Sequence, residues 1–221
     1  MEQDSTQAMI DWTTFTKVAE SGDLILFSGT SDLDKLIAAG TGGPYCHATT
    51  VYRPADGGPL LLWESDTMKM APDPLDPGND YLGAQCGDLI AAMNFMDTHE
   101  CTPFFRKLNY ARVPGFDDQL KQVILEYDGK LAFGSILDMI KNYFKGHYLG
   151  EAGPLNQVFC AELVAMTYVS LGLMSPTHPP NFYSPSSFSK YSHEVVLLEG
   201  TFEPEVLFDV ATIPPTSVTP E

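Results

Sequence analysis

Basic residues are scarce in this sequence. It carries 12 lysines and arginines against 29 aspartates and glutamates, which gives a formal net charge of −17. Binding to a phosphate backbone needs clustered lysine and arginine, so the composition argues against nucleic acid as a partner. The same shortage disfavours attachment to an anionic membrane through a basic patch. A basic protein remains a partner that the charge would suit.

Long apolar runs are also missing. No stretch approaches the roughly 18–20 residues that a membrane-spanning helix needs. The acidic start, Met-Glu-Gln-Asp-Ser, leads into no apolar signal segment. Cysteines in a chain without an export signal are expected to be reduced thiols rather than disulfides. We therefore expect a soluble protein of the cytoplasm or another intracellular compartment, without stable membrane insertion.

Motifs for metal, serine and phosphate chemistry are absent. Cys86 and Cys101 are separated by fourteen residues and form no CxxC pair, so a zinc site is not expected. No serine occupies a Gly-x-Ser-x-Gly turn, and no glycine-rich phosphate loop is present. We expect neither a bound metal nor a cofactor.

What the sequence does contain is an ordinary globular composition. Its 221 residues are 44% hydrophobic and 19% charged, which fits a folded chain with a core of its own rather than disorder. We expect a single domain over residues 1–212. The tail over 213–221 is rich in proline and poor in apolar side chains, and is expected to be disordered.

Hydrophobic periodicity and turn residues predict an α+β fold. Helices are expected at 8–20, 31–40, 116–128, 133–145 and 160–172, and strands at 24–27, 47–52, 60–64, 104–110, 194–198 and 206–210. The segment 88–97 fits either a helix or a strand. The strands at 47–52 and 60–64 flank a turn rich in proline and glycine, and are expected to pair as an antiparallel hairpin. Two proline-rich segments, 71–80 and 174–185, are predicted to be surface loops.

One cysteine stands at the start of a predicted helix. Cys160 follows Gly153-Pro154 and opens the apolar segment up to Gly172. The positive end of the helix dipole and the unpaired N–H groups there stabilise a thiolate, which is the reactive form of a thiol enzyme. A cysteine in an apolar helix is also often a plain core residue. Position alone leaves both interpretations open.

A histidine and a carboxylate are expected to lie near each other on the predicted hairpin. His47 opens one strand, and Glu64 ends the other, so the two become neighbours if they share a face. A carboxylate orients an imidazole and favours its protonated form, which a cysteine–histidine ion pair requires. Asp66 is two residues further along the same strand face and competes with Glu64 for this position.

Several short motifs follow one another in a characteristic order. They are Gly22-Asp23-Leu-Ile-Leu-Phe27, His47-Ala-Thr-Thr-Val-Tyr52, Leu62-Trp-Glu64, Val158-Phe-Cys160-Ala-Glu162-Leu-Val164, Leu171-Gly-Leu173 and Tyr183-Ser-Pro185-Ser-Ser-Phe188. Together they span most of the chain, roughly residues 20–190, and place the histidine strand before the cysteine helix. This order resembles the circularly permuted papain-like cysteine hydrolases, the permuted NlpC-type group that includes YiiX-like and YaeF-like amidases and relatives of lecithin:retinol acyltransferase.

The resemblance implies a circularly permuted papain-like fold, with an antiparallel sheet or barrel and flanking helices. It implies Cys160 as the nucleophile, His47 as general base and then general acid, and Glu64 as the residue that orients His47. The backbone N–H of Cys160 would meet the oxyanion. One departure is Gly-Lys-Leu-Ala-Phe at 129–133, where members of the group often carry Gly-Lys-Pro-Tyr. It bears on the shape of the substrate groove.

The expected activity is that of a cysteine hydrolase of the amidase or peptidase type, acting through an acyl-enzyme thioester on Cys160. A lipid acyl hydrolase or acyltransferase is the alternative within enzymes, and a non-catalytic protein-binding module is the alternative outside them. The substrate is accordingly a peptide, another amide or a lipid acyl group. Substrate-binding residues are expected among four side chains near the motifs: Tyr45, His147, Tyr148 and Tyr183.

Cys46 paired with His147 would restore the ordinary papain order of cysteine before histidine. Cys46 is followed by a predicted strand rather than a helix, so its thiolate would lack the support of a helix dipole. A pair with the adjacent His47 is poor, because neighbours on a strand point to opposite faces. This alternative is therefore the weaker one.

Overall fold

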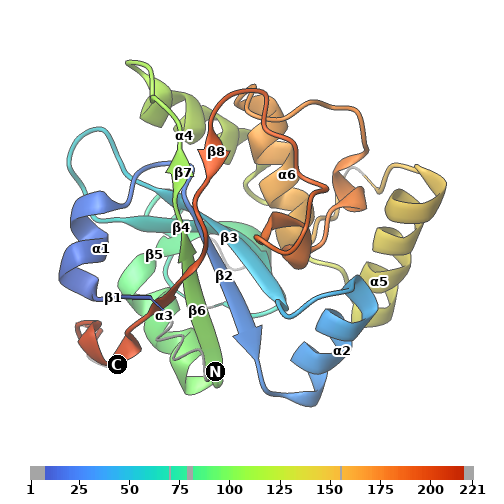
Figure 1. The fold of residues 1–221 in the computed structure, drawn as a ribbon, viewed down its shortest axis with the longest axis horizontal. Helices are drawn as coiled ribbons and strands as arrows, with labels where there is room; N and C mark the ends of the chain where they lie inside the picture. Colours follow the sequence, from blue (N-terminus) through green and yellow to red (C-terminus); the bar gives the residue numbers. More distant parts are fainter. Residues whose placement is uncertain (1–7, 70, 79–81, 155, 217–221) are drawn as a thin grey trace, which may run out of the picture.

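The computed structural model describes residues 8–69, 71–78, 82–154 and 156–216. An open seven-stranded sheet runs through the molecule in the order β1-β9-β6-β2-β3-β4-β5 (Figure 1). Its strands are β1 (Met9–Ile10), β2 (Leu24–Gly29), β3 (His47–Tyr52), β4 (Leu61–Asp66), β5 (Gly83–Asp88), β6 (Cys101–Arg106) and β9 (Val206–Phe208). β7 (Leu108–Asn109) and β8 (Thr201–Phe202) form a separate antiparallel pair.

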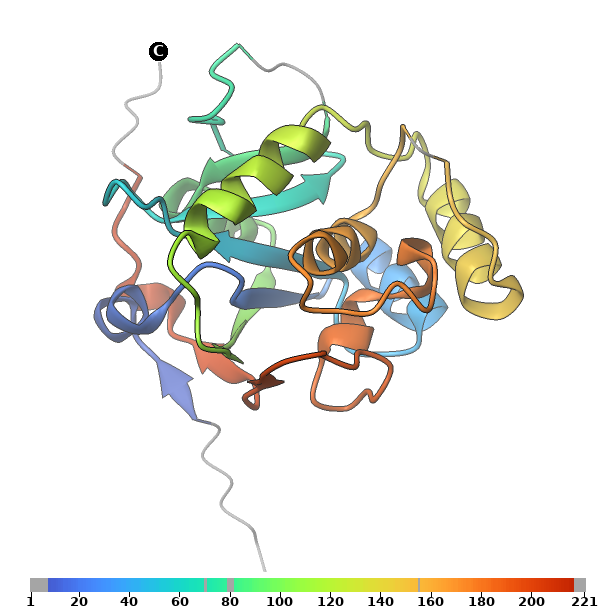
Figure 2. The same cartoon turned by 90° about the horizontal axis from the view of Figure 1, so that it is seen from above.

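Six α-helices accompany the sheet in the described part of the chain. They are α1 (Trp12–Val18), α2 (Asp32–Thr41), α3 (Leu89–Thr98), α4 (Phe116–Tyr127), α5 (Ile136–Phe144) and α6 (Cys160–Ser170). α2 and α5 pack against each other, and both views place them together at one end of the molecule (Figures 1 and 2). A π-helical turn over Lys145–Leu149 continues α5. No helix within the described residues is both long and apolar enough to cross a bilayer.

The alternation of side chains along β2 and β3 builds a core on each face of the sheet. Leu24, Leu26 and Ala48 pack with α6, whereas Ile25 and Val51 pack into a cluster with side chains of α1 and α3. A third cluster joins β4 and β5 to α4 and α6. Burial on both faces explains why β2 and β3 consist almost wholly of apolar and β-branched residues.

The α+β prediction is confirmed, while several details differ from expectation. The sheet is open rather than closed into a barrel, and it is mixed, because β1 pairs with β9 in parallel. The expected strand at 104–110 is divided into β6 and β7, and the segment 88–97 is mostly helix α3. The strand predicted at 194–198 is wrong: this segment has one isolated bridge, between Leu197 and Met174.

The C-terminal segment contacts the folded part as far as residue 214. The side chain of Asn94 donates a hydrogen bond of 2.9 Å to the carbonyl oxygen of Pro214, and Ile213 packs on the cluster beneath α3. The predicted disordered tail covers residues 213–221. Ile213 and Pro214 make the contacts above, contrary to that prediction, and residues 217–221 lie outside the described residues. The single-domain prediction over 1–212 stays a prediction.

A buried hydrogen bond ties β4 to α6. The indole Nε1–H of Trp63 donates to Thr167 Oγ1 over 2.9 Å, and the Thr167 hydroxyl donates in turn to Leu163 O over 2.8 Å. Trp63 and Thr167 are both fully buried. A buried donor that loses its acceptor bears its full desolvation penalty, so this contact fixes how the helix sits on the sheet.

Replacing Thr167 by valine keeps the shape but removes the acceptor for Trp63. We expect the T167V variant to lose about 1–3 kcal/mol of unfolding free energy, measured by urea denaturation followed by tryptophan fluorescence. The matched control is T13V, on the exposed face of α1, which should change stability by less than about 0.5 kcal/mol. Equal stability of the two variants would show that the bond has no net value.

Candidate active site

His47 is held between two carboxylates of the neighbouring strand. Nε2 of His47 lies 3.1 Å from Glu64 Oε2, and Nδ1 lies 3.8 Å from Asp66 Oδ2. The β3–β4 register pairs Thr50 with Trp63. Continued along both strands, this register sets His47 opposite Asp66, with Glu64 on the diagonal of the same face. An ionised carboxylate can only accept, so the contact with Glu64 places a proton on Nε2.

Burial and neighbouring charge shift both partners of this contact. The His47 side chain is 9% exposed. Burial by itself lowers the pKa of His47, but the Cys160 thiolate, the hydrogen bond to Glu64 and the charge of Asp66 together raise it well above its usual value. Burial raises the pKa of Glu64, against the opposing effect of His47. The imidazole therefore holds its proton more firmly than a free histidine.

Cys160 is the first residue of α6, as the sequence predicted for the start of this helix. Phe159 precedes it in an extended conformation. The segment before the helix is fastened to the sheet, because the Ser65 hydroxyl of β4 donates to Val158 O over 2.8 Å. The Val158 N–H donates to Leu131 O over 3.0 Å. Cys160 is thus positioned from the strand that also carries Glu64 and Asp66.

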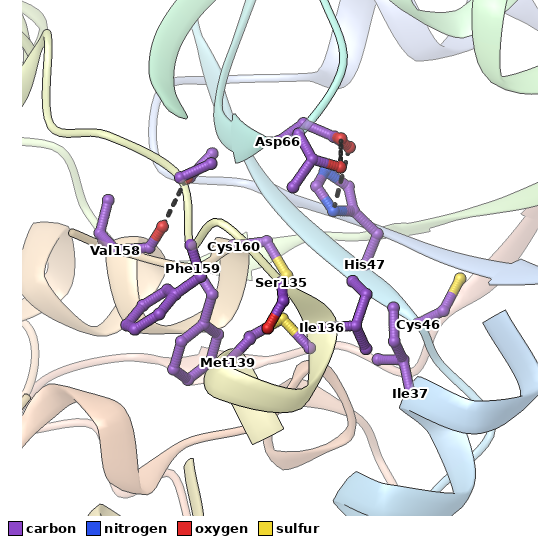
Figure 3. Close-up of a pocket in the computed structure, with 14 residues that line it drawn as sticks. Ile37, Cys46, His47, Asp66, Ser135, Ile136, Met139, Val158, Phe159 and Cys160 are labelled. Carbon is purple, nitrogen blue, oxygen red and sulfur yellow. Dashed lines mark hydrogen bonds and ion pairs between the residues drawn. The ribbon is translucent and has the colours of Figure 1, made fainter. Parts of the chain in front are cut away.

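Cys160 and His47 line one pocket (Figure 3). In the close-up, Asp66 lies beside the His47 ring, while Ile37, Ile136 and Met139 lie away from it. The pocket wall is formed by β3, β4, the ends of α2 and α5, and the segment before α6. Its lining residues are Ile37, Cys46, His47, Ser65, Asp66, Thr67, Ala132, Phe133, Ser135, Ile136, Met139, Val158, Phe159 and Cys160.

The arrangement has the parts of a nucleophilic thiol site. It holds a cysteine at a helix start, where N–H groups and the dipole favour a thiolate. It also holds a histidine of raised pKa in contact with that cysteine, and a carboxylate that orients the histidine. Apolar side chains of the same wall, among them Phe133 and Met139, offer contacts to an acyl or side-chain group.

Glu162 is a buried carboxyl in the first turn of α6. It is 4% exposed and accepts hydrogen bonds from Asn142 Nδ2 at 3.2 Å and from the Phe159 N–H at 3.4 Å. Burial raises its pKa to about 8, against the lowering effect of these bonds. Below about pH 8 this carboxyl is therefore largely neutral and does not act as a charge that complements the helix dipole.

The four expected substrate-binding residues lie outside this pocket. Tyr45 and Tyr183 are buried in the core cluster shared with α6, where Tyr45 packs edge-on against Phe104. His147 and Tyr148 stand on the π-helical turn and line a second pocket, together with serines of the segment 184–192. The segment 174–183 contributes no residue to the lining of the Cys160 pocket.

Cys46 does not meet His147 in the structure. Cys46 lines the Cys160 pocket, whereas His147 lines the second pocket and bonds to Phe182 O at 3.1 Å through Nδ1. In Figure 3 the Cys46 sulfur points away from Cys160. The thiol of Cys46 instead donates to Phe27 O over 3.3 Å.

Sequence reasoning missed a group formed by Asp34, Cys46 and Cys101. Their ligating atoms lie within 4.8 Å of one another, although the residues come from α2, the start of β3 and the start of β6. Their sequence separation follows no metal-binding spacing. The pairing of β2 with both β3 and β6 is what brings them together.

Comparisons with known proteins find likeness at the level of structure alone. No protein-family model matches the chain, and no curated protein matches it. Among solved structures, it is similar to the metalloprotein YiiX from Escherichia coli O157:H7, with 14% sequence identity and a TM-score of 0.47. That likeness covers 72% of this chain and 71% of the other. A likeness of this size does not establish a shared family.

The raised pKa of Glu162 makes stability depend on pH. Between its ordinary value near 4.5 and about 8 the folded state binds the proton more tightly than the unfolded state, so the unfolding free energy falls as the pH rises through this window. Residue 162 of E162Q is uncharged at every pH. We therefore expect the unfolding free energy of E162Q, relative to that of the parent, to rise by about 3–5 kcal/mol at most between pH 5 and pH 9.

Urea denaturation at pH 5, 7 and 9 measures this difference. The control is E126Q on the exposed face of α4, whose difference from the parent should stay nearly constant over the same range. A parent that keeps the same stability relative to E162Q at all three pH values would contradict the buried, neutral carboxyl.

Proposed function

We propose that the chain is a cysteine hydrolase of the amidase or peptidase type, with Cys160 as nucleophile and His47 as general base and acid. The observation that carries the proposal is the single pocket in which both residues meet, with His47 hydrogen-bonded to a buried carboxylate. The fold we infer is the circularly permuted papain-like one, since the histidine strand precedes the cysteine helix in the chain.

The chemistry follows from this pairing. The Cys160 thiolate adds to the carbonyl carbon of an amide, and the Cys160 N–H at the helix start stabilises the oxyanion. As the C–N bond breaks, the His47 imidazolium gives its proton to the leaving nitrogen, which leaves a thioester and a neutral imidazole. The imidazole then takes a proton from water while the water oxygen adds to the thioester. Cleavage of the C–S bond releases the acid and restores the ion pair.

Glu64 is the better of the two candidates for the third residue. Its oxygen lies at hydrogen-bonding distance from His47, at 3.1 Å, whereas the nearest Asp66 oxygen lies at 3.8 Å. Glu64 is also the more deeply buried of the two. We assign it the orienting role, and Asp66 a supporting charge at the pocket wall.

A lipid acyl substrate is the second candidate, because the pocket wall is largely apolar. Ile37, Phe133, Ile136 and Met139 line it, and helices α2 and α5 beside it expose large apolar side chains. These are Leu33, Leu36, Leu137 and Phe144. An acyl chain would fit this wall, so fluorogenic peptide amides should be compared with p-nitrophenyl esters of short and long acyl chains.

Alkylation of each cysteine by iodoacetamide tests the ion pair. Peptide mass spectrometry from pH 4 to 9 should show Cys160 reacting selectively below pH 7, because the protonated His47 stabilises its thiolate. We expect H47A to lose this selective reaction. Burial raises the pKa of Cys86 well above its usual value, so this thiol serves as an unreactive internal reference.

The variant H193A is the matched control, since His193 is exposed and lies outside the pocket. It should label like the parent. Sluggish labelling of Cys160 that rises only near the ordinary thiol value of about 8.5 would refute the ion pair. That outcome would favour a protein-binding module on the same fold, with the acidic surface available to a basic partner.

The orienting role assigned to Glu64 predicts that the isosteric variant E64Q changes the labelling of Cys160 more than D66N does. E64Q keeps the shape but removes the buried negative charge, so His47 should hold its proton less firmly. The pH at which Cys160 is labelled should then rise by about one unit, roughly a tenfold change in rate at a fixed acidic pH. D66N should have a clearly smaller effect in the same assay. A larger effect of D66N would exchange the two roles.

A further inference from the structure

Two cysteines and an aspartate come together on the side of His47 that does not face Cys160. The atoms that could bind a ligand, Cys46 Sγ, Cys101 Sγ and a carboxylate oxygen of Asp34, lie within 4.8 Å of one another. The Cys46 thiol donates to Phe27 O over 3.3 Å, and the Cys101 thiol donates to His99 O over 3.6 Å. Cys46 and Cys101 are buried, and Asp34 is partly buried.

The backbone beneath the group is shaped to admit the carboxylate. Gly29, the last residue of β2, pairs with Cys101 across the ladder. A Cβ atom on Gly29 would lie 2.2 Å from Asp34 Oδ2 and 2.3 Å from its Cγ. A side chain at position 29 would therefore displace the Asp34 carboxylate. Ser31 holds the same Oδ2 through its N–H at 3.2 Å and its hydroxyl at 2.5 Å.

We propose that Asp34, Cys46 and Cys101 form a binding site for a divalent transition-metal ion of the zinc type. Two sulfur ligands and one carboxylate oxygen suit Zn²⁺, which binds thiolates and carboxylates in a tetrahedron, here with water as the fourth ligand. In such a tetrahedron, Zn–S near 2.3 Å and Zn–O near 2.0 Å set the ligand atoms about 3.5–3.8 Å apart. The observed group needs to contract by about 1.3 Å at most.

The site has a route to solvent and a favourable charge along it. Cys101 lies on the wall of a surface depression that is also lined by Asp97 and Glu100. Carboxylates at such an opening attract cations. On the inner side, Cys46 belongs to the wall of the Cys160 pocket. The metal would sit between the depression and the pocket.

A metal there joins three parts of the chain around the catalytic pocket. It would fasten α2 through Asp34, the start of β3 through Cys46, and β6 through Cys101. Because Cys46 is the residue before His47 and Ile37 of α2 lines the pocket, the ion would fix both the histidine strand and one wall. The assignment does not depend on the hydrolase proposal, since none of the three ligands takes part in that chemistry.

Cobalt(II) titration of the full chain tests the site directly. The background is C160S, which removes the active-site thiol as a competing ligand, in a buffer with a non-thiol reductant. We expect one equivalent of Co²⁺ to produce thiolate-to-cobalt charge-transfer absorption together with the visible bands of a tetrahedral ion. Zn²⁺ should displace the cobalt and raise the melting temperature of the protein.

Six further variants separate ligation from folding. C46S, C101S and D34N should each weaken Co²⁺ affinity at least tenfold, and C86S, which alters a buried cysteine outside the group, should not. G29A keeps all three ligands but displaces the carboxylate, and should also weaken binding, whereas G134A, which has open space for a methyl group, should not. Cobalt bound without charge-transfer absorption, or with equal affinity in C101S and C86S, would overturn the proposal.

Discussion

The buried imidazole of His47 is the group on which the site depends. A protonated ring removed from water is costly unless negative partners compensate its charge, and here Glu64, Asp66 and the Cys160 thiolate surround it. Two of these partners come from β4 and one from the start of α6. The ion pair therefore requires that β3, β4 and α6 hold one fixed arrangement.

Two contacts of β4 provide that arrangement. The Trp63 indole anchors the middle of α6 through Thr167, and the Ser65 hydroxyl anchors the segment just before the helix through Val158. Both side chains point to the opposite strand face from Glu64, as alternation along a strand requires. One strand thus carries the carboxylates on one face and the helix attachments on the other. The six-residue strand β4 (Leu61–Asp66) therefore both attaches α6 to the sheet and carries the carboxylates beside His47.

Short-range sequence patterns indicated those features of the site that depend on the periodicity of a single strand or helix. Strand alternation predicted that His47 and Glu64 share a face, and the helix-start position of Cys160 followed from apolar periodicity. Strand β5 was missed because Gly-Ala-Gln-Cys-Gly-Asp has low β-propensity, and forms through pairing with β4. The group of Asp34, Cys46 and Cys101 was missed for a related reason: its members meet only across β2, which no spacing in the sequence encodes.

Several buried groups around α6 hold their protons more firmly than free side chains do. The unfolding free energy of the protein therefore depends on pH in one direction. His47 has a raised pKa, so its contribution to stability is full below its ordinary value of about 6.5 and is lost as the pH rises through the raised value. Buried carboxyls of raised pKa act in the same direction, because ionising them inside the fold costs more than in the unfolded chain. The net charge of −17 adds self-repulsion as the remaining acids ionise. The raised pKa values of His47, Glu64 and Glu162 therefore all favour the folded state at acidic rather than alkaline pH.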